Sequence, residues 1–236
     1  MIVEVLFSEV CNLFGDGKNS EYLRMSLPDA EFHYTGLNDT PFFAENTPDI
    51  ILLGSMTENI QRRVIEKLRP LKDRITALAD GGTVFLATGN AGEIFCKKIS
   101  YITEEKETQG LGLFDLTVKT DLFNRYNGKV LGKTSDGLTV IGHRSQFSFV
   151  YGDNSACAFL SVERGCGINP DSKFEGWRRN NLICTHLLGA ILPCNPLFTE
   201  YLISLAGGNQ KAAFRDAALD AYNRRLKEFS APETKF

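Results

Sequence analysis

Two short apolar runs, separated by one long helical segment, constrain the fold more than any other feature of the chain. "PDIILLG" (48–54) and "TVFLATG" (83–89) have the length and the unbroken hydrophobicity of strands buried on both faces of a parallel sheet. Residues 57–82 between them have a helical pattern, with Thr57 as a plausible N-cap and two glycines as a stop. The chain therefore has the strand–helix–strand pattern of a parallel sheet.

The rest of the first hundred residues repeats this alternation. "IVEVLF" (2–7) and "AEFHYTG" (30–36) are further predicted strands, with a short helix predicted in "SEYLRMSL" (20–27). "AGEIFCKKI" (91–99) is expected to begin another helix, and Pro70 is expected to kink or split the 57–82 helix. This pattern predicts an α/β fold with a doubly wound, mostly parallel sheet.

From about residue 113 the pattern changes to short strands separated by Gly, Asp and Asn turns. The predicted strands are "FDLTVKT", "GKVLGKT", "LTVIGHR", "FSFVYGD" and "CAFLSVE". We expect them to be antiparallel strands that extend or flank the sheet. Two helices are predicted at about 197–206 and 209–229, followed by a polar tail at about 230–236. Since no repeat or linker interrupts the chain, residues 1–236 are predicted to form a single domain.

Composition excludes several classes of function. The net charge is -3 and the basic residues are dispersed among acids, which argues against nucleic-acid binding. No apolar run approaches the roughly 20 residues of a membrane helix, and no signal peptide is recognisable, so a cytoplasmic protein is expected. None of the three histidines has metal-ligand spacing, and the glycine-rich segment 12–19 lacks the spacing of a nucleotide-binding loop. We therefore expect neither a metal nor another cofactor.

"FLATGNAGEI" (85–94) resembles the strand-to-helix corner on which many α/β enzymes present a nucleophile. This corner holds Gly89, Asn90 and Ala91, none of which can attack a carbonyl group. In doubly wound sheets, ligands bind at the carboxyl ends of the strands. "LLGSMTEN" (52–59) and "CTHLLGAIL" (184–192) are expected to meet the corner there.

Three segments are similar to class I-type glutamine amidotransferases of the CobB/CobQ group. "NLFGDGKN" (12–19), "GLGLFD" (110–115) and "EGWRRNNLICTHLLGAILPCNP" (175–196) resemble motifs of that family in the same order and with matching spacing. Within the group the chain particularly resembles GatD-type glutaminase subunits, which work beside a Mur-ligase-like partner to amidate the peptidoglycan precursor lipid II. The resemblance implies a class I amidotransferase fold with a flavodoxin-like core, and a function in cell-wall synthesis.

The resemblance also implies a catalytic cysteine, a histidine and a glycine-rich oxyanion loop, and these positions differ here. In a gapless registration the cysteine falls at Gly89 (or at Asn90 after a one-residue shift), and the glutamine of its motif falls at Glu93. The other vestigial positions are the oxyanion-loop residues Gly54 and Ser55, Arg144 in place of a family glutamate, and Leu188 in place of the histidine. The registration therefore predicts a fold that was kept and a reaction that was lost.

Two function hypotheses follow from this registration. The main one is a pseudoenzyme, a binding or partner subunit that has lost glutamine hydrolysis and still docks a Mur-ligase-like protein. The alternative is an active glutaminase subunit that supplies ammonia to a cell-wall precursor or a cobyric-acid-like substrate through a relocated pair. Cys184 and His186 are the candidates, because they face the same side if "LICTHLL" is a strand. Cys96 lies seven residues beyond Gly89, too far along a helix to replace the nucleophile.

A third hypothesis is a different hydrolase or a small-molecule sensor on the same fold. Its ligand, glutamine-like or anionic, would lie near Asn90, Glu93 and Arg144. An arginine in place of a carboxylate inverts the local charge and would favour an anion.

Overall fold

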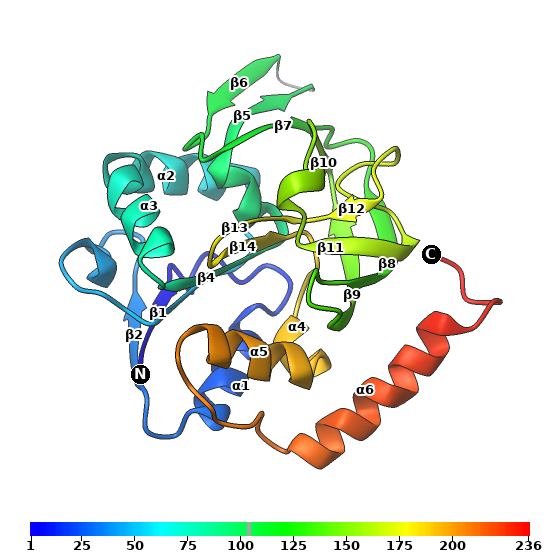
Figure 1. The fold of residues 1–236 in the computed structure, drawn as a ribbon. Coiled ribbons are helices and arrows are strands. Elements are labelled where there is room, and N and C mark those ends of the chain that lie inside the picture. Colours follow the sequence, from blue (N-terminus) through cyan, green and yellow to red (C-terminus); the bar gives the residue numbers. More distant parts are fainter. Residues whose placement is uncertain (103–104) are drawn as a thin grey trace.

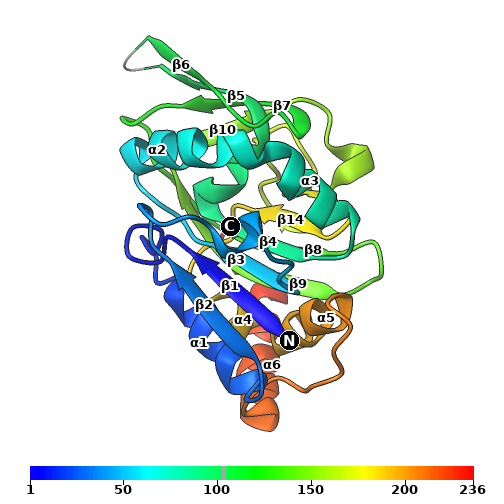
Figure 2. The same ribbon diagram turned by 90° about the vertical axis from the view of Figure 1, so that its left-hand side faces the viewer.

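A six-stranded sheet forms the centre of the computed structural model, which describes residues 1–102 and 105–236 (Figures 1 and 2). The strand order is β13 (Trp177–Arg179), β14 (Leu182–Thr185), β4 (Val84–Thr88), β3 (Ile50–Leu53), β1 (Ile2–Leu6) and β2 (Glu31–Thr35). All neighbouring strands are parallel except β13 and β14. The predicted parallel sheet is therefore confirmed, and the carboxyl ends of β1, β3, β4 and β14 meet at one edge.

Helices cover both faces of this sheet, as Figure 2 shows. Along β3, Ile50 and Leu52 pack on one face, while Ile51 and Leu53 pack on the other. The first face is covered by α1 (Gly17–Ser26), α4 (Ile191–Cys194) and α5 (Pro196–Leu205). The second face is covered by α2 (Glu58–Leu68) and α3 (Lys72–Asp80). Burial on both faces explains why β3 is apolar without interruption.

The predicted helix over 57–82 forms, and it is divided near Pro70. The Thr57 hydroxyl accepts a hydrogen bond from the Ile60 main-chain N–H (3.5 Å), so Thr57 caps α2 as expected. A 3₁₀ turn, η2 (Arg69–Leu71), then separates α2 from α3. Proline cannot donate the main-chain hydrogen bond of an uninterrupted helix.

The prediction that a helix begins in residues 91–99 is wrong. Residues Gly89–Phe95 form a 3₁₀ turn, η3, and the chain then enters the strand β5 (Cys96–Tyr101). Gly89 and Gly92 weaken a helix, whereas the buried Ile99 and Tyr101 alternate with more exposed residues, as a strand requires. Cys96 consequently begins a strand instead of lying on a helix.

The strands after the corner form two further sheets of four strands each, which flank the parallel sheet (Figure 1). One has the order β10 (Ser148–Tyr151), β7 (Phe114–Thr120), β5 and β6 (Lys106–Gln109). The other has the order β12 (Phe174–Glu175), β11 (Leu160–Gly165), β8 (Tyr126–Lys133) and β9 (Thr139–Gln146). The expected flanking antiparallel strands are present, and among the strand pairs of these two sheets in the described ranges only β5 and β7 are parallel.

The last helix, α6 (Arg215–Ser230), lies along the β8–β9 sheet, and the tail beyond it is anchored (Figure 1). Helix α6 starts later than the expected 209, because Phe214 before it has a left-handed backbone (φ 50°). The Arg164 guanidinium donates to the carbonyl groups of Phe229, Ala231 and Thr234 and lies 4.4 Å from the centre of the Phe236 ring. Among the helices in the described ranges, none is long and apolar enough to cross a membrane.

Candidate functional site

Gly89 occupies a left-handed position at the corner, with φ 60°, which favours glycine over residues that carry a Cβ atom. A Cβ atom placed there would lie 2.7 Å from Cβ of Ser55 and 2.8 Å from Cδ2 of Leu188. A side chain at position 89 would thus point between positions 55 and 188. The family resemblance assigns position 89 to the nucleophile, position 55 to the oxyanion loop and position 188 to the base. The fold therefore brings these three positions together.

Asp16 ties the corner to the 54–58 loop. Its carboxylate accepts hydrogen bonds from the hydroxyl groups of Thr88 (2.6 Å) and Ser55 (2.5 Å). The loop also approaches closely at Gly54, where a Cβ atom would lie 2.2 Å from the carbonyl oxygen of Cys11. Asp16 stands at the N-cap position of α1, but its side chain makes no cap hydrogen bond there. The carboxylate instead fixes the spacing between the two halves of the site.

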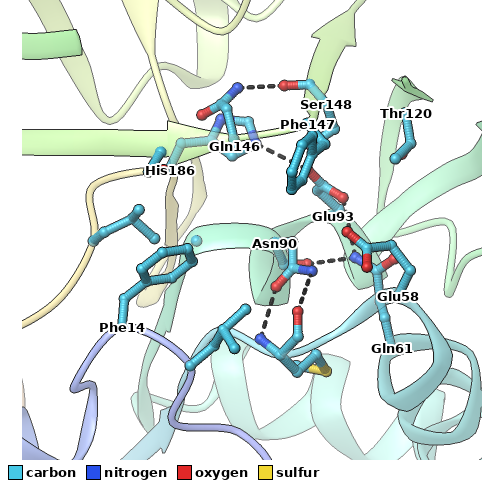
Figure 3. Close-up of a pocket in the computed structure, with 15 residues that line it drawn as sticks. Phe14, Glu58, Gln61, Asn90, Glu93, Thr120, Gln146, Phe147, Ser148 and His186 are labelled. Atoms are coloured by element: carbon cyan, nitrogen blue, oxygen red, sulfur yellow. Dashed lines mark hydrogen bonds and ion pairs between the residues drawn. The ribbon is translucent and has the colours of Figure 1, made fainter. Parts of the chain in front are cut away.

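Asn90 pairs with the main chain of Met56 in the loop opposite the corner (Figure 3). The Met56 N–H donates to Asn90 Oδ1 (3.0 Å), and Asn90 Nδ2 donates to the Met56 carbonyl oxygen (2.7 Å). Gln61 Nε2 holds the Asn90 main-chain carbonyl at 2.7 Å. A main-chain N–H of this loop, the kind of donor that stabilises an oxyanion, is therefore already used within the chain.

A buried polar network lies behind this pair. Glu93 is 1% exposed and its carboxylate accepts hydrogen bonds from Ser148 Oγ and, through its other oxygen, from Gln61 Nε2 (3.0 Å). His186 Nε2 lies 3.1 Å from Glu93 Oε1, and His186 Nδ1 lies 3.3 Å from Arg144 Nη2. Figure 3 shows the side chains of Glu93, Gln61, Ser148 and His186 around one pocket. The buried carboxylate and guanidinium thus have the partners that buried charges require.

These contacts fix the proton of His186. A guanidinium group is only a donor, so Nδ1 of His186 accepts from Arg144 and carries no proton. The ring N–H is then at Nε2, where it is donated to Glu93 Oε1. With both ring nitrogens engaged, His186 has no lone pair left to act as a general base toward a thiol.

Arg144 is buried (1% exposed) and is not an open anion site. Besides His186, its guanidinium donates to Gln146 Oε1 (2.9 Å) and to the carbonyl groups of Cys166 (2.8 Å) and Gly167. The positive charge that the sequence places at position 144 is therefore satisfied by groups of the same chain.

Neither candidate thiol lines the pocket at Gly89. Cys184 is the third residue of β14 and is fully buried, and its Cβ faces Gly92. Cys96, at the start of β5, is also fully buried. Burial raises the pKa of both thiols well above the usual range, which disfavours the reactive thiolate. The structure therefore does not place a Cys184–His186 pair in a catalytic arrangement.

The pocket itself is small, about 40 Å³, against roughly 300–1,000 Å³ for typical small-molecule sites. It lies between the corner, α2 and the 145–148 segment, and no cysteine lines it among the residues that the structure describes. Of the sequence candidates, Gly89, Asn90, Glu93, His186 and Leu188 line it. The sequence did not indicate Asp16 or Gln61, since both have the appearance of ordinary turn or helix-surface residues.

Known proteins share this architecture. The solved structure of PurLQS from Thermotoga maritima superposes with a TM-score of 0.53 at 12% identity, covering 95% of this chain and 98% of that chain. Another structure, of a glutamine amidotransferase, gives a TM-score of 0.57 at 14% identity and covers 88% of this chain and all of that one. Identities this low show a common fold only.

The sequence comparisons are more specific. The GatD subunit of lipid II isoglutaminyl synthase (glutamine-hydrolyzing) from Staphylococcus aureus (strain N315) is 26% identical over 216 residues. The match covers 90% of this chain and 87% of that protein. The model of the CobB/CobQ-like glutamine amidotransferase domain matches residues 2–195, which include the corner, the 54–58 loop and the 184–189 segment. The chain belongs to the CobB/CobQ-like glutamine amidotransferase family.

Proposed function

We propose that this chain is an amidotransferase-like subunit that does not hydrolyse glutamine and serves as a binding or partner subunit. The observation that carries the proposal is the corner at Gly89, which has no thiol and no space for one between Ser55 and Leu188. Two other observations support it: both ring nitrogens of His186 are engaged within the chain, and the main chain of Met56 pairs with Asn90. Glycine and leucine thus stand at the positions of the nucleophile and the base, and a main-chain N–H of the oxyanion loop is already bonded to Asn90.

A Mur-ligase-like protein is the partner that we propose. The support is the similarity to GatD, a subunit of a lipid II isoglutaminyl synthase. Leu13 and Phe14 line the pocket and are 52% and 36% exposed, so two adjacent large apolar side chains are accessible at its mouth. We infer that the partner contacts the chain over these two residues, at the mouth of the pocket.

The activity test uses the purified chain with glutamine, alone and with the Mur-ligase-like protein. Neither glutamate nor ammonia is expected, while the S. aureus GatD relative serves as the positive control in the same assay. Turnover that a single Cys184→Ser substitution abolishes would refute the proposal and establish the relocated pair. A thiol-directed glutamine analogue gives an independent reading, because labelling of one cysteine in stoichiometric amount would also contradict it.

The partner test is a binding measurement by size-exclusion chromatography. A Leu13→Asp/Phe14→Asp variant is expected to lose the complex, since it introduces two charges at the inferred contact. Phe214→Asp is the matched control, because Phe214 is 72% exposed and precedes α6. Equal binding by both variants would exclude the contact at the pocket mouth.

A further inference from the structure

We propose that the main chain of Met56 forms a binding edge for a primary carboxamide and that Asn90 occupies this edge as a built-in plug. This inference rests on the proposed function and adds a physical cause for the closed pocket. The Asn90 side chain is itself a primary carboxamide, held by one accepted and one donated hydrogen bond. The pocket is thus closed by a side chain with the chemistry of the ligand that it would take.

The pairing is chemically selective. The N–H and C=O groups of one residue present a donor and an acceptor side by side, and a primary amide presents the complementary acceptor and donor. A carboxylate offers only acceptors and would meet the Met56 carbonyl oxygen without a proton between them. A tertiary amide likewise has no N–H to donate. The edge therefore discriminates in favour of a primary carboxamide.

Asn90 is well placed to act as a plug. It lines the pocket and is only half-buried, so its side chain lies between the Met56 edge and the open space of the site. In Figure 3, dashed lines mark the two hydrogen bonds that the Asn90 side chain makes with this edge. Its own main chain is held from the other side by Gln61 (2.7 Å). Removing the Asn90 side chain would thus uncover the edge without releasing the corner.

The chain contains a matched control for this contact. Asn195 pairs with the main chain of Ile141 in the same way, with both hydrogen bonds at 2.9 Å. That pair is buried (Asn195 is 1% exposed) and lines none of the pockets found in the described part of the chain. Asn195→Ala therefore removes an equivalent clamp with no ligand site behind it.

The test follows the Met56 amide signal by ¹⁵N–¹H NMR during titration with propionamide, using N,N-dimethylpropionamide as the analogue without an N–H. In Asn90→Ala, propionamide is expected to shift the Met56 signal in a saturable way. Its affinity should be at least about tenfold above that of the wild type, in which two hydrogen bonds must first be displaced. The dimethyl analogue should shift the signal far less, and Asn195→Ala should behave as the wild type does.

A folded Asn90→Ala protein whose Met56 signal ignores propionamide would overturn the proposal. A wild-type response as strong as that of the variant would overturn it too. If Asn90→Ala does not fold, Asn90→Ser serves instead, since its shorter side chain also uncovers the edge. The proposed function fails separately, through glutamine turnover by the wild-type chain, so the two failures are distinguishable.

Discussion

Substitution of Gly89 by alanine tests the geometry on which the site assignment depends. Two costs are expected: a left-handed backbone with a Cβ atom, about 1–2 kcal/mol, and overpacking, about 1–3 kcal/mol. The overpacking follows from the approaches of 2.7 Å to Ser55 and 2.8 Å to Leu188, both shorter than real Cβ contacts. The free energy of unfolding should therefore fall by about 2–5 kcal/mol, which lowers the melting temperature by roughly 5–15 °C.

Gly137→Ala separates the two costs. Gly137 also has a left-handed backbone (φ 82°), but no atom lies within 4 Å of its added Cβ. This variant should lose only the backbone part, about 1–2 kcal/mol. Denaturant unfolding of the two variants gives the steric part as their difference.

The steric part should depend on Leu188. The double variant Gly89→Ala/Leu188→Ala lacks the contact with Leu188 Cδ2. It is therefore expected to be about 1 kcal/mol more stable than the sum of the two single substitutions predicts. The reasoning is refuted if Gly89→Ala costs no more than Gly137→Ala, or if the double-mutant cycle shows no coupling. Either result would mean that position 89 does not point at position 188, and the family registration of the site would lose its geometric support.

Three further predictions concern the surroundings of the site. Arg144→Met removes the cation of the buried network that includes His186 and the Glu93 carboxylate, and it should lower the free energy of unfolding by about 3–5 kcal/mol. In denaturant unfolding, Glu93→Gln combined with Arg144→Met should restore part of that free energy, and no recovery would argue against a coupled network. Arg164→Ala should release the C-terminal tail, lower the free energy of unfolding by about 2–3 kcal/mol and speed amide hydrogen exchange beyond α6. Unchanged exchange would show that contacts other than those of Arg164 hold the tail. Under native conditions iodoacetamide should label the fully buried Cys184 at least tenfold more slowly than the half-buried Cys194, because burial raises the pKa of the Cys184 thiol. Mass spectrometry measures both labelling rates, and equal rates would contradict the burial of β14.

The scaffold was predictable because its signals are local. An apolar run such as Ile50–Leu53 reports burial on both faces, and Thr57 and Pro70 mark the start and the break of a helix within a few residues of the event itself. The family motifs then gave the order of the elements around the corner. The geometry confirms that positions 55, 89 and 188 converge, although no two of them are adjacent in the sequence.

The course of the chain after the corner was not predictable from the same signals. Whether residues 96–101 form a helix or a strand depends on pairing with β7, whose residues lie about twenty positions further on. A short segment with two preceding glycines has no strong preference of its own, so the tertiary partner decides. Cys96 was misplaced for this reason.

The polar contacts of the site were also hidden. Asp16 finds Ser55 and Thr88 at separations of 39 and 72 residues, while its immediate neighbours suggest only a helix cap. Gln61 lies in an amphipathic helix, where a polar residue usually faces solvent, and yet it is buried against Glu93. Partners this distant are set by the fold and not by the local pattern.

The 3₁₀ turn after Gly89 has an electrostatic consequence for any attempt to restore chemistry at this corner. The N-terminus of an α-helix carries the equivalent of about half a positive charge, and this field lowers the pKa of a thiol placed there. Here the segment after the corner is a 3₁₀ helix of only seven residues, about two turns, and the peptide dipoles of β5 beyond it largely cancel. A cysteine installed at position 89 would have only the field of that short segment, and it would adjoin Ser55 and Thr88, whose hydroxyl groups both donate to the Asp16 carboxylate. A nearby carboxylate raises the pKa of a thiol, so both the short helical segment and the side chains around this corner oppose thiolate chemistry at position 89.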